Sequence, residues 1–186
     1  GANQASKLVR QAWNEYETPI DYGLAPSQLP KIAACIASDF PAKLYYVAFR
    51  NNAFDTHVQQ PNLHQRLLSY ASDAVAGFIA DMERLGMGDK VAVMMFSEFG
   101  RRAGENTNLG TDHGTANTMF LAGNNVAGGH YGQLPDLTKL DETDNLVYTT
   151  DFRRVYASVI DGWLKTGQSD KVLKGKFETF PIFVDG

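Results

Sequence analysis

One long amphipathic helix between two short apolar segments constrains the fold of this chain more than any other feature. Apolar residues recur at helical spacing over about residues 61–85, where Pro61 suits the first turn and Gly86 the C-terminal cap. Nearly continuous apolar runs at residues 44–49 and 91–96 flank the helix and are typical of buried strands. Strand, helix and strand in this order predict a right-handed βαβ unit with parallel strands.

Shorter periodic segments on both sides of this unit complete an α/β pattern. They predict helices over about residues 5–16, 30–36 and 152–166, a third strand over residues 119–122 and an edge strand over residues 177–184. Thr150 or Asp151 is expected to cap the last of these helices. A chain of 186 residues suits one sizeable core, so residues 1–186 are expected to form a single α/β domain.

Composition excludes some classes of partner. The hydrophobic content of 44% and the charged content of 20% are typical of a folded domain. A net charge of −4 offers no basic surface, which argues against nucleic acid as a partner. No apolar run reaches the roughly 20 residues that cross a bilayer, which argues against membrane insertion. The single cysteine, Cys35, lies among apolar residues and is expected to be a buried structural thiol.

Three compact polar motifs hold the residues best suited to a functional site. Phe54-Asp55-Thr56-His57 follows the first predicted strand, residues 97–102 follow the second, and residues 110–114 lie in the long loop before the third. Ligands of an open parallel sheet bind beyond the carboxyl ends of its strands, so all three motifs are expected in one cleft. The candidate metal ligands are Asp55, His57, Glu98, Asp112 and His113.

Carboxylates and imidazoles in this combination indicate a divalent metal or an acid/base site. They suit Zn²⁺, Mn²⁺ or iron, and with more oxygen ligands Mg²⁺ or Ca²⁺. Gly110 and Gly114 flank the Asp112-His113 pair and would let the backbone approach a ligand closely. Purely structural roles stay open for several of these residues. Asp55 and His130 could be turn residues, and His57 could form hydrogen bonds within its loop. Glu98 could be an ion-pair partner of Arg101 or Arg102, and His64 could be an exposed helix residue.

Common catalytic signatures are absent from the sequence. It contains no Gly-x-Ser-x-Gly elbow, P-loop, His-Glu-x-x-His or Cys-x-x-Cys motif. The hydroxyl residues beside the polar motifs are Thr56, Ser97 and Thr111, and none stands out as an activated nucleophile.

These motifs resemble the C-terminal half of the DUF1501 family, exported bacterial proteins of the alkaline phosphatase-like superfamily. The resemblance runs from about residue 24 onward. It is carried by Phe54-Asp55-Thr56-His57, residues 91–102, Glu105-Asn106, residues 110–116, Gly128-Gly129 and residues 150–153. It implies an α/β fold, a parallel-sheet sandwich of the alkaline phosphatase-like type, present here as a partial domain. It also implies export to the periplasm, although this chain carries no signal peptide and begins without methionine.

Enzymes of that superfamily hold phosphate or sulfate with two metals or one calcium while a serine, threonine or formylglycine attacks. By strand order, Asp55 and His57 match their first group of ligands, Glu98 and Phe99 fall at the Asp-His pair, and His113 falls at the later histidine. Phe99 cannot ligate a metal, and Ala53 replaces the usual glycine before the first motif. The resemblance places the nucleophile in an N-terminal half that this chain lacks, so an incomplete hydrolase site is expected.

The resulting hypothesis is a metal-dependent hydrolase of phosphate or sulfate esters. Arg101 or Arg102 would hold a non-bridging oxygen of a small anionic ester through charge-assisted contacts. The alternative is a non-catalytic relative that binds an anion or a sulfated glycan in the same cleft. A third interpretation is a structural polar network without a metal.

Overall fold

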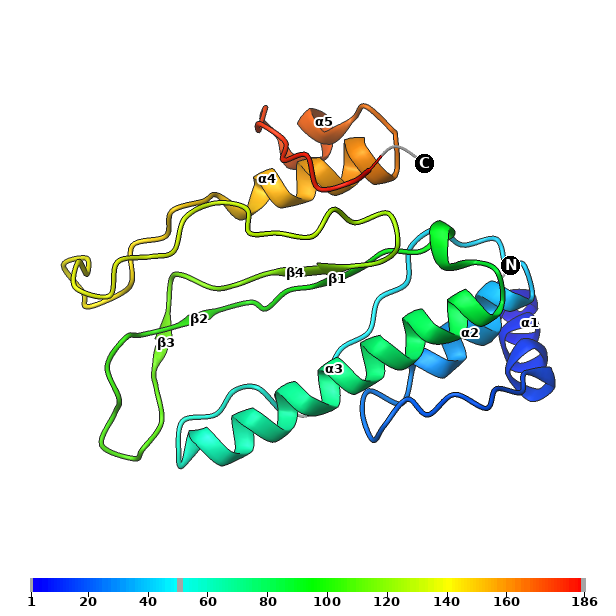
Figure 1. The fold of residues 1–186 in the computed structure, drawn as a ribbon, viewed down its shortest axis with the longest axis horizontal. Coiled ribbons are helices and arrows are strands. Elements are labelled where there is room, and N and C mark those ends of the chain that lie inside the picture. The colour runs from blue at the N-terminus through cyan, green and yellow to red at the C-terminus, as the bar shows by residue number, and fades with distance from the viewer. Residues whose placement is uncertain (1, 50–51, 185–186) are drawn as a thin grey trace. The chain divides into compact units, whose positions relative to one another are not determined.

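A computed structural model describes residues 2–49 and 52–184 of the chain (Figure 1). The chain forms two compact units. The first unit consists of residues 1–91 and 108–110, and the second of residues 92–107 and 111–186. Each is described by itself, and the expectation that residues 1–186 make one domain remains a prediction. No helix in the described part of the chain has the length and apolar character to cross a membrane.

Helices dominate the first unit. They are α1 (Ala2–Glu15), α2 (Leu29–Ala37), α3 (Gln60–Arg84) and a short 3₁₀ turn, Gly88–Lys90. Helix α2 packs against both α1 and α3. The core of the unit includes fully or almost fully buried side chains from α2 and α3: Ala33, Ala34, Ala74, Phe78 and Met82. Burying a side chain such as Phe78 or Met82 contributes about 1.5–3 kcal/mol, which is why the apolar stripe of the sequence predicts these helices correctly.

A buried carboxylate ties the segment after α1 to α3. Asp81 is 0% exposed and accepts hydrogen bonds from the hydroxyls of Thr18 (2.8 Å), Tyr22 (2.6 Å) and Tyr16, and from Nε of Arg84 (2.8 Å). Burial alone would raise the pKa of Asp81, but these donors outweigh it and hold the pKa below its usual range. Burial and the contact with Asp81 raise the pKa of Tyr16 to about 12.

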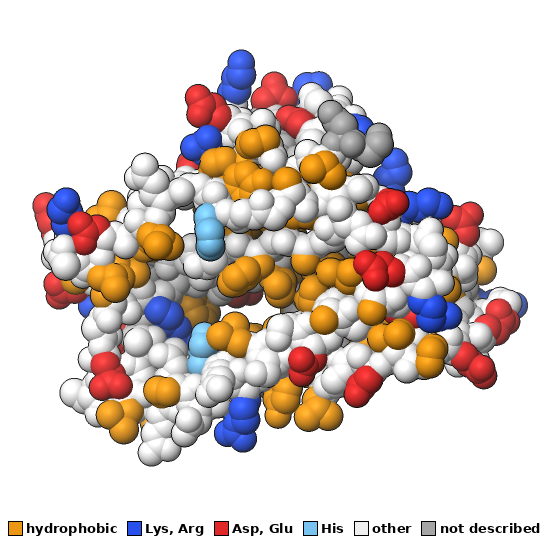
Figure 2. All heavy atoms as spheres, in the orientation of Figure 1, with side chains coloured by type: hydrophobic (Ala, Val, Ile, Leu, Met, Phe, Trp, Pro, Cys, Tyr) orange, Lys and Arg blue, Asp and Glu red, His pale blue; other side chains and the backbone are white. Residues whose placement is uncertain are grey.

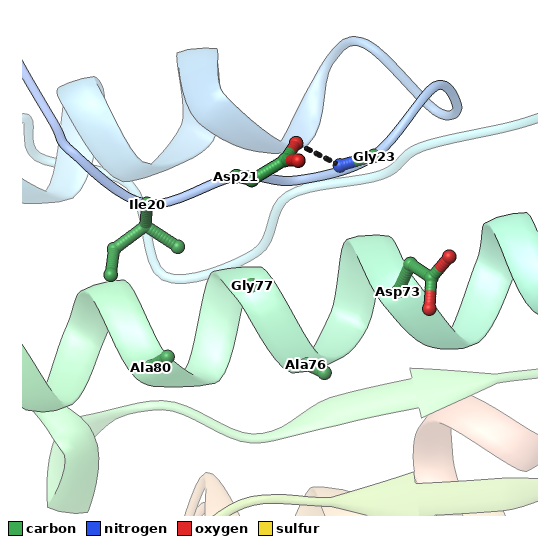
Figure 3. A pocket seen from close by; sticks show the side chains of 7 residues that line it. All are labelled: Ile20, Asp21, Gly23, Asp73, Ala76, Gly77 and Ala80. Atoms are coloured by element: carbon green, nitrogen blue, oxygen red, sulfur yellow. Dashed lines mark hydrogen bonds between the residues drawn. The ribbon is translucent and has the colours of Figure 1, made fainter.

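The same face of α3 carries a shallow, open groove of about 430 Å³ (Figure 3). Gly77 forms part of its floor, because a Cβ there would lie 2.7 Å from the carbonyl oxygen of Asp21. The charged groups that line the groove are Asp21 and Asp73, both exposed. Asp21 is already engaged through a 2.8 Å hydrogen bond from the backbone N–H of Gly23. These two carboxylates would repel an anionic substrate, so the groove does not suit one.

The predicted strand at residues 44–49 is wrong. The segment belongs to no helix or strand among the described residues. Leu44 is 73% exposed and Tyr46 is 72% exposed, so the apolar run is not covered on both faces. A strand requires a hydrogen-bonded neighbour as well as apolar side chains, and the neighbour is what sequence periodicity cannot supply. The βαβ unit predicted from this segment is therefore not formed within the described residues.

Two short antiparallel ladders form the sheet structure of the second unit. Strand β1 (Val93–Met95) pairs with β4 (Phe120–Ala122), and β2 (Gly100–Arg101) pairs with β3 (His113–Gly114). Four residues, 96–99, connect β1 to β2, whereas five, 115–119, connect β3 to β4. β1 and β4 lie where the sequence predicts strands. The parallel-sheet sandwich remains a prediction, because the ladders formed by the described residues are antiparallel.

The C-terminal part of the second unit is helical. Asp151 caps α4 (Phe152–Ala157) by accepting a 2.9 Å hydrogen bond from the backbone N–H of Arg153, which confirms the predicted cap. The helix continues as a π-helix, Ser158–Trp163, and is followed by α5 (Ser169–Leu173). The expected edge strand over residues 177–184 is reduced to a single antiparallel bridge between Val126 and Phe183.

Candidate functional site

Asp55 and His57 form a preassembled carboxylate–imidazole pair in the first unit. Nε2 of His57 lies 2.9 Å from Oδ1 of Asp55, and the two side chains are 40% and 35% exposed. Thr56, between them, is only 5% exposed and accepts a 2.9 Å hydrogen bond from the side-chain amide of Gln60. Thr56 is buried while the side chains on either side of it are partly exposed, so Asp55 and His57 are presented together at the surface.

Aromatic contacts hold this motif in place. The ring of Phe54 meets the rings of Phe49 (5.0 Å) and His64 (5.6 Å) edge to face. His64 is half-buried, which corrects the expectation of an exposed helix residue. The aromatic Phe54, ten residues before it in the sequence, is the signal that could have predicted this contact. His130, in the second unit, is exposed as expected for a turn residue.

Part of the long loop packs against the backbone of the first motif. The backbone N–H groups of Gln59 and Gln60 donate 2.9 Å hydrogen bonds to the carbonyl oxygens of Asn108 and Leu109. Gly110 follows directly, and a Cβ at this position would lie 2.2 Å from the carbonyl oxygen of His57. The sequence interpretation gave Gly110 a role in approaching a ligand. The structure shows instead that it allows close approach to the backbone that carries His57.

In the second unit, the β2–β3 ladder gathers three side chains of the polar motifs. The rings of Phe99 and His113 are stacked, with centroids 3.7 Å apart and planes inclined by 11°. The guanidinium carbon of Arg101 lies 5.0 Å from the centre of the Phe99 ring. Nη1 of Arg101 donates a 2.6 Å hydrogen bond to the carbonyl oxygen of Thr111. Arg101 is therefore fixed by contacts inside the hairpin.

Arg102 is in a different environment from its neighbour. Its backbone N–H donates a 3.0 Å hydrogen bond to the carbonyl oxygen of Asp112. Its side chain is half-buried, and Nε is buried without a hydrogen-bond partner among the described residues. A buried N–H without a partner costs about 1–3 kcal/mol, so this guanidinium is suited to receive an acceptor such as an oxyanion.

The two remaining candidate carboxylates differ in how they are held. Oδ1 of Asp112 accepts a 3.2 Å hydrogen bond from the side-chain amide of Asn106, and its side chain is exposed. Glu98 is also exposed and forms no ion pair or hydrogen bond with the described residues, so the ion pair with Arg101 or Arg102 is not formed. Asp55 and His57 thus lie together in the first unit, whereas the Asp112 side chain contacts Asn106 and the His113 ring stacks on Phe99 in the second. The convergence of all five candidate ligands in one cleft remains a prediction.

The described residues form helices and short antiparallel ladders, and the first unit carries a partly exposed carboxylate–imidazole pair, Asp55 with His57. The chain belongs to the DUF1501 family, whose model is described as "Protein of unknown function (DUF1501)" and matches residues 41–177. This match contains every candidate ligand and both candidate arginines. No curated protein and no solved structure matches the chain.

Proposed function

We propose that this chain carries part of a metal-dependent hydrolase of phosphate or sulfate esters, with Asp55, His57 and His113 as central ligands of a divalent metal. The observation that carries the proposal is the Asp55–His57 pair, already 2.9 Å apart and partly exposed. A carboxylate beside an imidazole serves a metal in two ways: both groups ligate it, or the carboxylate orients the imidazole that does. In either case the residues present suit the ion.

Chain connectivity supports the inclusion of Asp112 and His113. Gly110 is packed on the backbone of His57. Asp112 and His113 follow Gly110 by two and three residues, and three residues of extended chain span at most about 11 Å. Their side chains are therefore within reach of a metal held by the first motif. Glu98 is proposed as a further oxygen ligand, because its exposed carboxylate is not engaged by the described residues.

Arg102 is the better candidate for contact with the substrate anion. Its buried Nε lacks a partner in the described part of the chain, whereas Arg101 is engaged by Thr111 and Phe99. A guanidinium binds a non-bridging oxygen of phosphate or sulfate through charge-assisted hydrogen bonds. A bound divalent metal would supply polarisation of the ester oxygen. The substrate class proposed is a small anionic ester.

A second candidate function is binding of an anion or sulfated glycan without catalysis. It is favoured because the hydroxyls of Thr56 and Ser97 are both engaged in hydrogen bonds. The side chain of Thr56 is 5% exposed and hydrogen-bonded to Gln60. The hydroxyl of Ser97 donates a 3.1 Å hydrogen bond to the carbonyl oxygen of Phe99. Neither is arranged as an attacking group. Membership of the alkaline phosphatase-like superfamily and export to the periplasm remain proposals from the resemblance.

The test is metal and anion binding by the purified protein. Metal content and calorimetric titration with Zn²⁺, Mn²⁺ and Ca²⁺ should show a bound ion that His57→Gln, His113→Gln and Asp55→Asn each weaken at least tenfold. His130→Gln, which alters an exposed histidine outside the motifs, is the matched control. Metal binding together with metal-dependent hydrolysis of nitrophenyl phosphate or sulfate supports the hydrolase. Sulfate binding without turnover supports the second candidate. The absence of any bound metal rejects the metal-dependent hydrolase.

A further inference from the structure

We infer that Phe99 is a positioning residue: its ring fixes the plane of the His113 imidazole and thereby the direction in which that histidine coordinates the metal. The inference rests on the proposed function and goes further, since it assigns a role to a residue that cannot ligate. Its basis is the face-to-face stack, in which the ring centroids lie 3.7 Å apart and the planes are inclined by only 11°.

The register of the ladder explains why these two rings meet. Arg101 and His113 lie directly opposite each other in the β2–β3 ladder. Phe99 precedes Arg101 by two residues, so its side chain lies on the same face and diagonally across from His113. On the other face the opposing pair is Gly100 and Gly114, and a Cβ on Gly100 would lie 1.7 Å from the carbonyl oxygen of Ala116. At this pair of positions the ladder therefore leaves no room for a side chain on the face opposite the stack.

Phe99 is itself held in place, at its backbone by hydrogen bonds and at its ring by Arg101, so it can impose an orientation on its neighbour. The carbonyl oxygen of Phe99 accepts hydrogen bonds from the side chains of Asn117 (2.9 Å) and Ser97 (3.1 Å). The guanidinium of Arg101 lies over the ring at 5.0 Å and is fixed by its 2.6 Å hydrogen bond to the carbonyl oxygen of Thr111. The phenyl ring is half-buried, whereas His113 is exposed.

Stacking is compatible with metal coordination by the same imidazole. The stack uses the face of the His113 ring, whereas the lone pair that binds a metal lies in the ring plane. An exposed histidine samples several side-chain rotamers, and ordering them on binding lowers affinity. A neighbour that orders the ring before the metal binds avoids this loss of affinity. Residues that orient metal-bound histidines by contacting them have an effect of this kind, because their removal lowers metal affinity by about 10–100-fold.

The experiment compares Phe99→Leu with Phe99→Trp. Leucine keeps an apolar side chain and removes the aromatic ring, whereas tryptophan restores a ring. Phe120→Leu, which removes a 53% exposed phenylalanine from the same unit, is the matched control. Two quantities are measured on the intact chain: the chemical shifts of the His113 ring protons without metal, assigned with His113→Gln, and the affinity for Zn²⁺ and Mn²⁺.

We expect the His113 ring protons of the wild type to be shifted upfield by the phenyl ring. This shift should disappear in Phe99→Leu and return in Phe99→Trp. Metal affinity should fall about tenfold in Phe99→Leu, recover in Phe99→Trp and stay at the wild-type level in Phe120→Leu. Wild-type affinity in Phe99→Leu, with the ring shift lost, would overturn the inference and leave the proposed function standing. If the wild type binds no metal, both are rejected. An absent ring shift in the wild type rejects the stack on which the inference rests.

Discussion

The hydroxyl of Tyr22 donates a 2.6 Å hydrogen bond to the carboxylate of Asp81, 59 residues away along the chain. The same carboxylate also accepts hydrogen bonds from Tyr16 and Thr18. Three side chains of the segment between α1 and α2 are therefore tied to one buried carboxylate on α3. Removing one partner of a buried, hydrogen-bonded charge is among the most destabilising single changes, since the remaining donors lose their acceptor.

Asp81→Ala is expected to lower the free energy of unfolding of the first unit by about 3–5 kcal/mol, because several donors lose a fully buried acceptor. Urea unfolding followed by circular dichroism measures the change. Glu83→Ala, which removes an exposed carboxylate from the same helix, is the matched control and should change stability by less than about 0.5 kcal/mol. Equal effects of the two substitutions would contradict the importance of this network.

The tyrosines of the network predict a loss of stability at alkaline pH. Folding raises the pKa of Tyr16 from its ordinary value of 10.0 to about 12 through burial and its contact with Asp81. A pKa raised in the folded state stabilises the protein fully below the unfolded value, and this contribution is lost as pH rises from 10.0 towards 12. Unfolding titrations should show this decline in the wild type and a weaker one in Tyr16→Phe. Tyr46→Phe, at a 72% exposed tyrosine, should retain the wild-type slope.

Gly110→Ala should weaken both the fold and metal binding. Its new methyl group would lie 2.2 Å from the carbonyl oxygen of His57, so the loop and the motif must separate. Such overpacking costs typically about 1–3 kcal/mol. Gly104→Ala lies in the same loop with no atom within 4 Å of its Cβ and serves as the control. Thermal melts and metal titrations of both variants check the prediction, which is contradicted if the two behave alike.

The neighbouring arginines should respond in opposite ways to replacement by alanine. Arg101→Ala loses the hydrogen bond to Thr111 and the contact with Phe99, so it should lower stability by about 1–3 kcal/mol. Arg102→Ala removes a guanidinium whose buried Nε has no partner in the described part of the chain. It should leave stability nearly unchanged and weaken sulfate binding about tenfold or more.

Thermal melts and calorimetric titration with sulfate separate the two roles. The variants serve as controls for each other, because both remove one positive charge from adjacent positions. Unchanged sulfate affinity in Arg102→Ala would end the proposed contact between this residue and an anion. A loss of stability in Arg102→Ala equal to that in Arg101→Ala would show that both arginines are structural.

Helices could be predicted from the sequence because their signals are local. The apolar stripe of α3 predicts the buried face of this 25-residue helix. Pro61 near its start and Gly86 just beyond its end predict where the helix begins and ends. Strand pairing is not local. Residues 44–49 have a strand-like composition without a neighbouring strand, and β1 pairs with β4 in an antiparallel register that the parallel expectation did not include.

The candidate site shows the same division. Asp55 and His57 could be predicted to meet because they are only two residues apart in the chain. The stack of Phe99 on His113 depends on the β2–β3 register, which no spacing in the sequence reveals. From the sequence alone, Phe99 is only a residue that cannot ligate a metal at a position where a ligand is expected. Its role can be assigned only when the side chain across the ladder is known.

Residues 44–49 also bear on how this polypeptide behaves at high concentration. Figure 2 shows apolar side chains at the surface of the molecule, and Leu44 and Tyr46 are among the most exposed large hydrophobic residues that the structure describes. An exposed apolar segment that belongs to no sheet of the described residues can pair with other molecules, and a lysine is a common natural guard against such pairing. Light scattering of concentrated samples should therefore show aggregates in the wild type that Tyr46→Lys reduces. Dilute solutions are the appropriate state in which to measure metal and anion affinities.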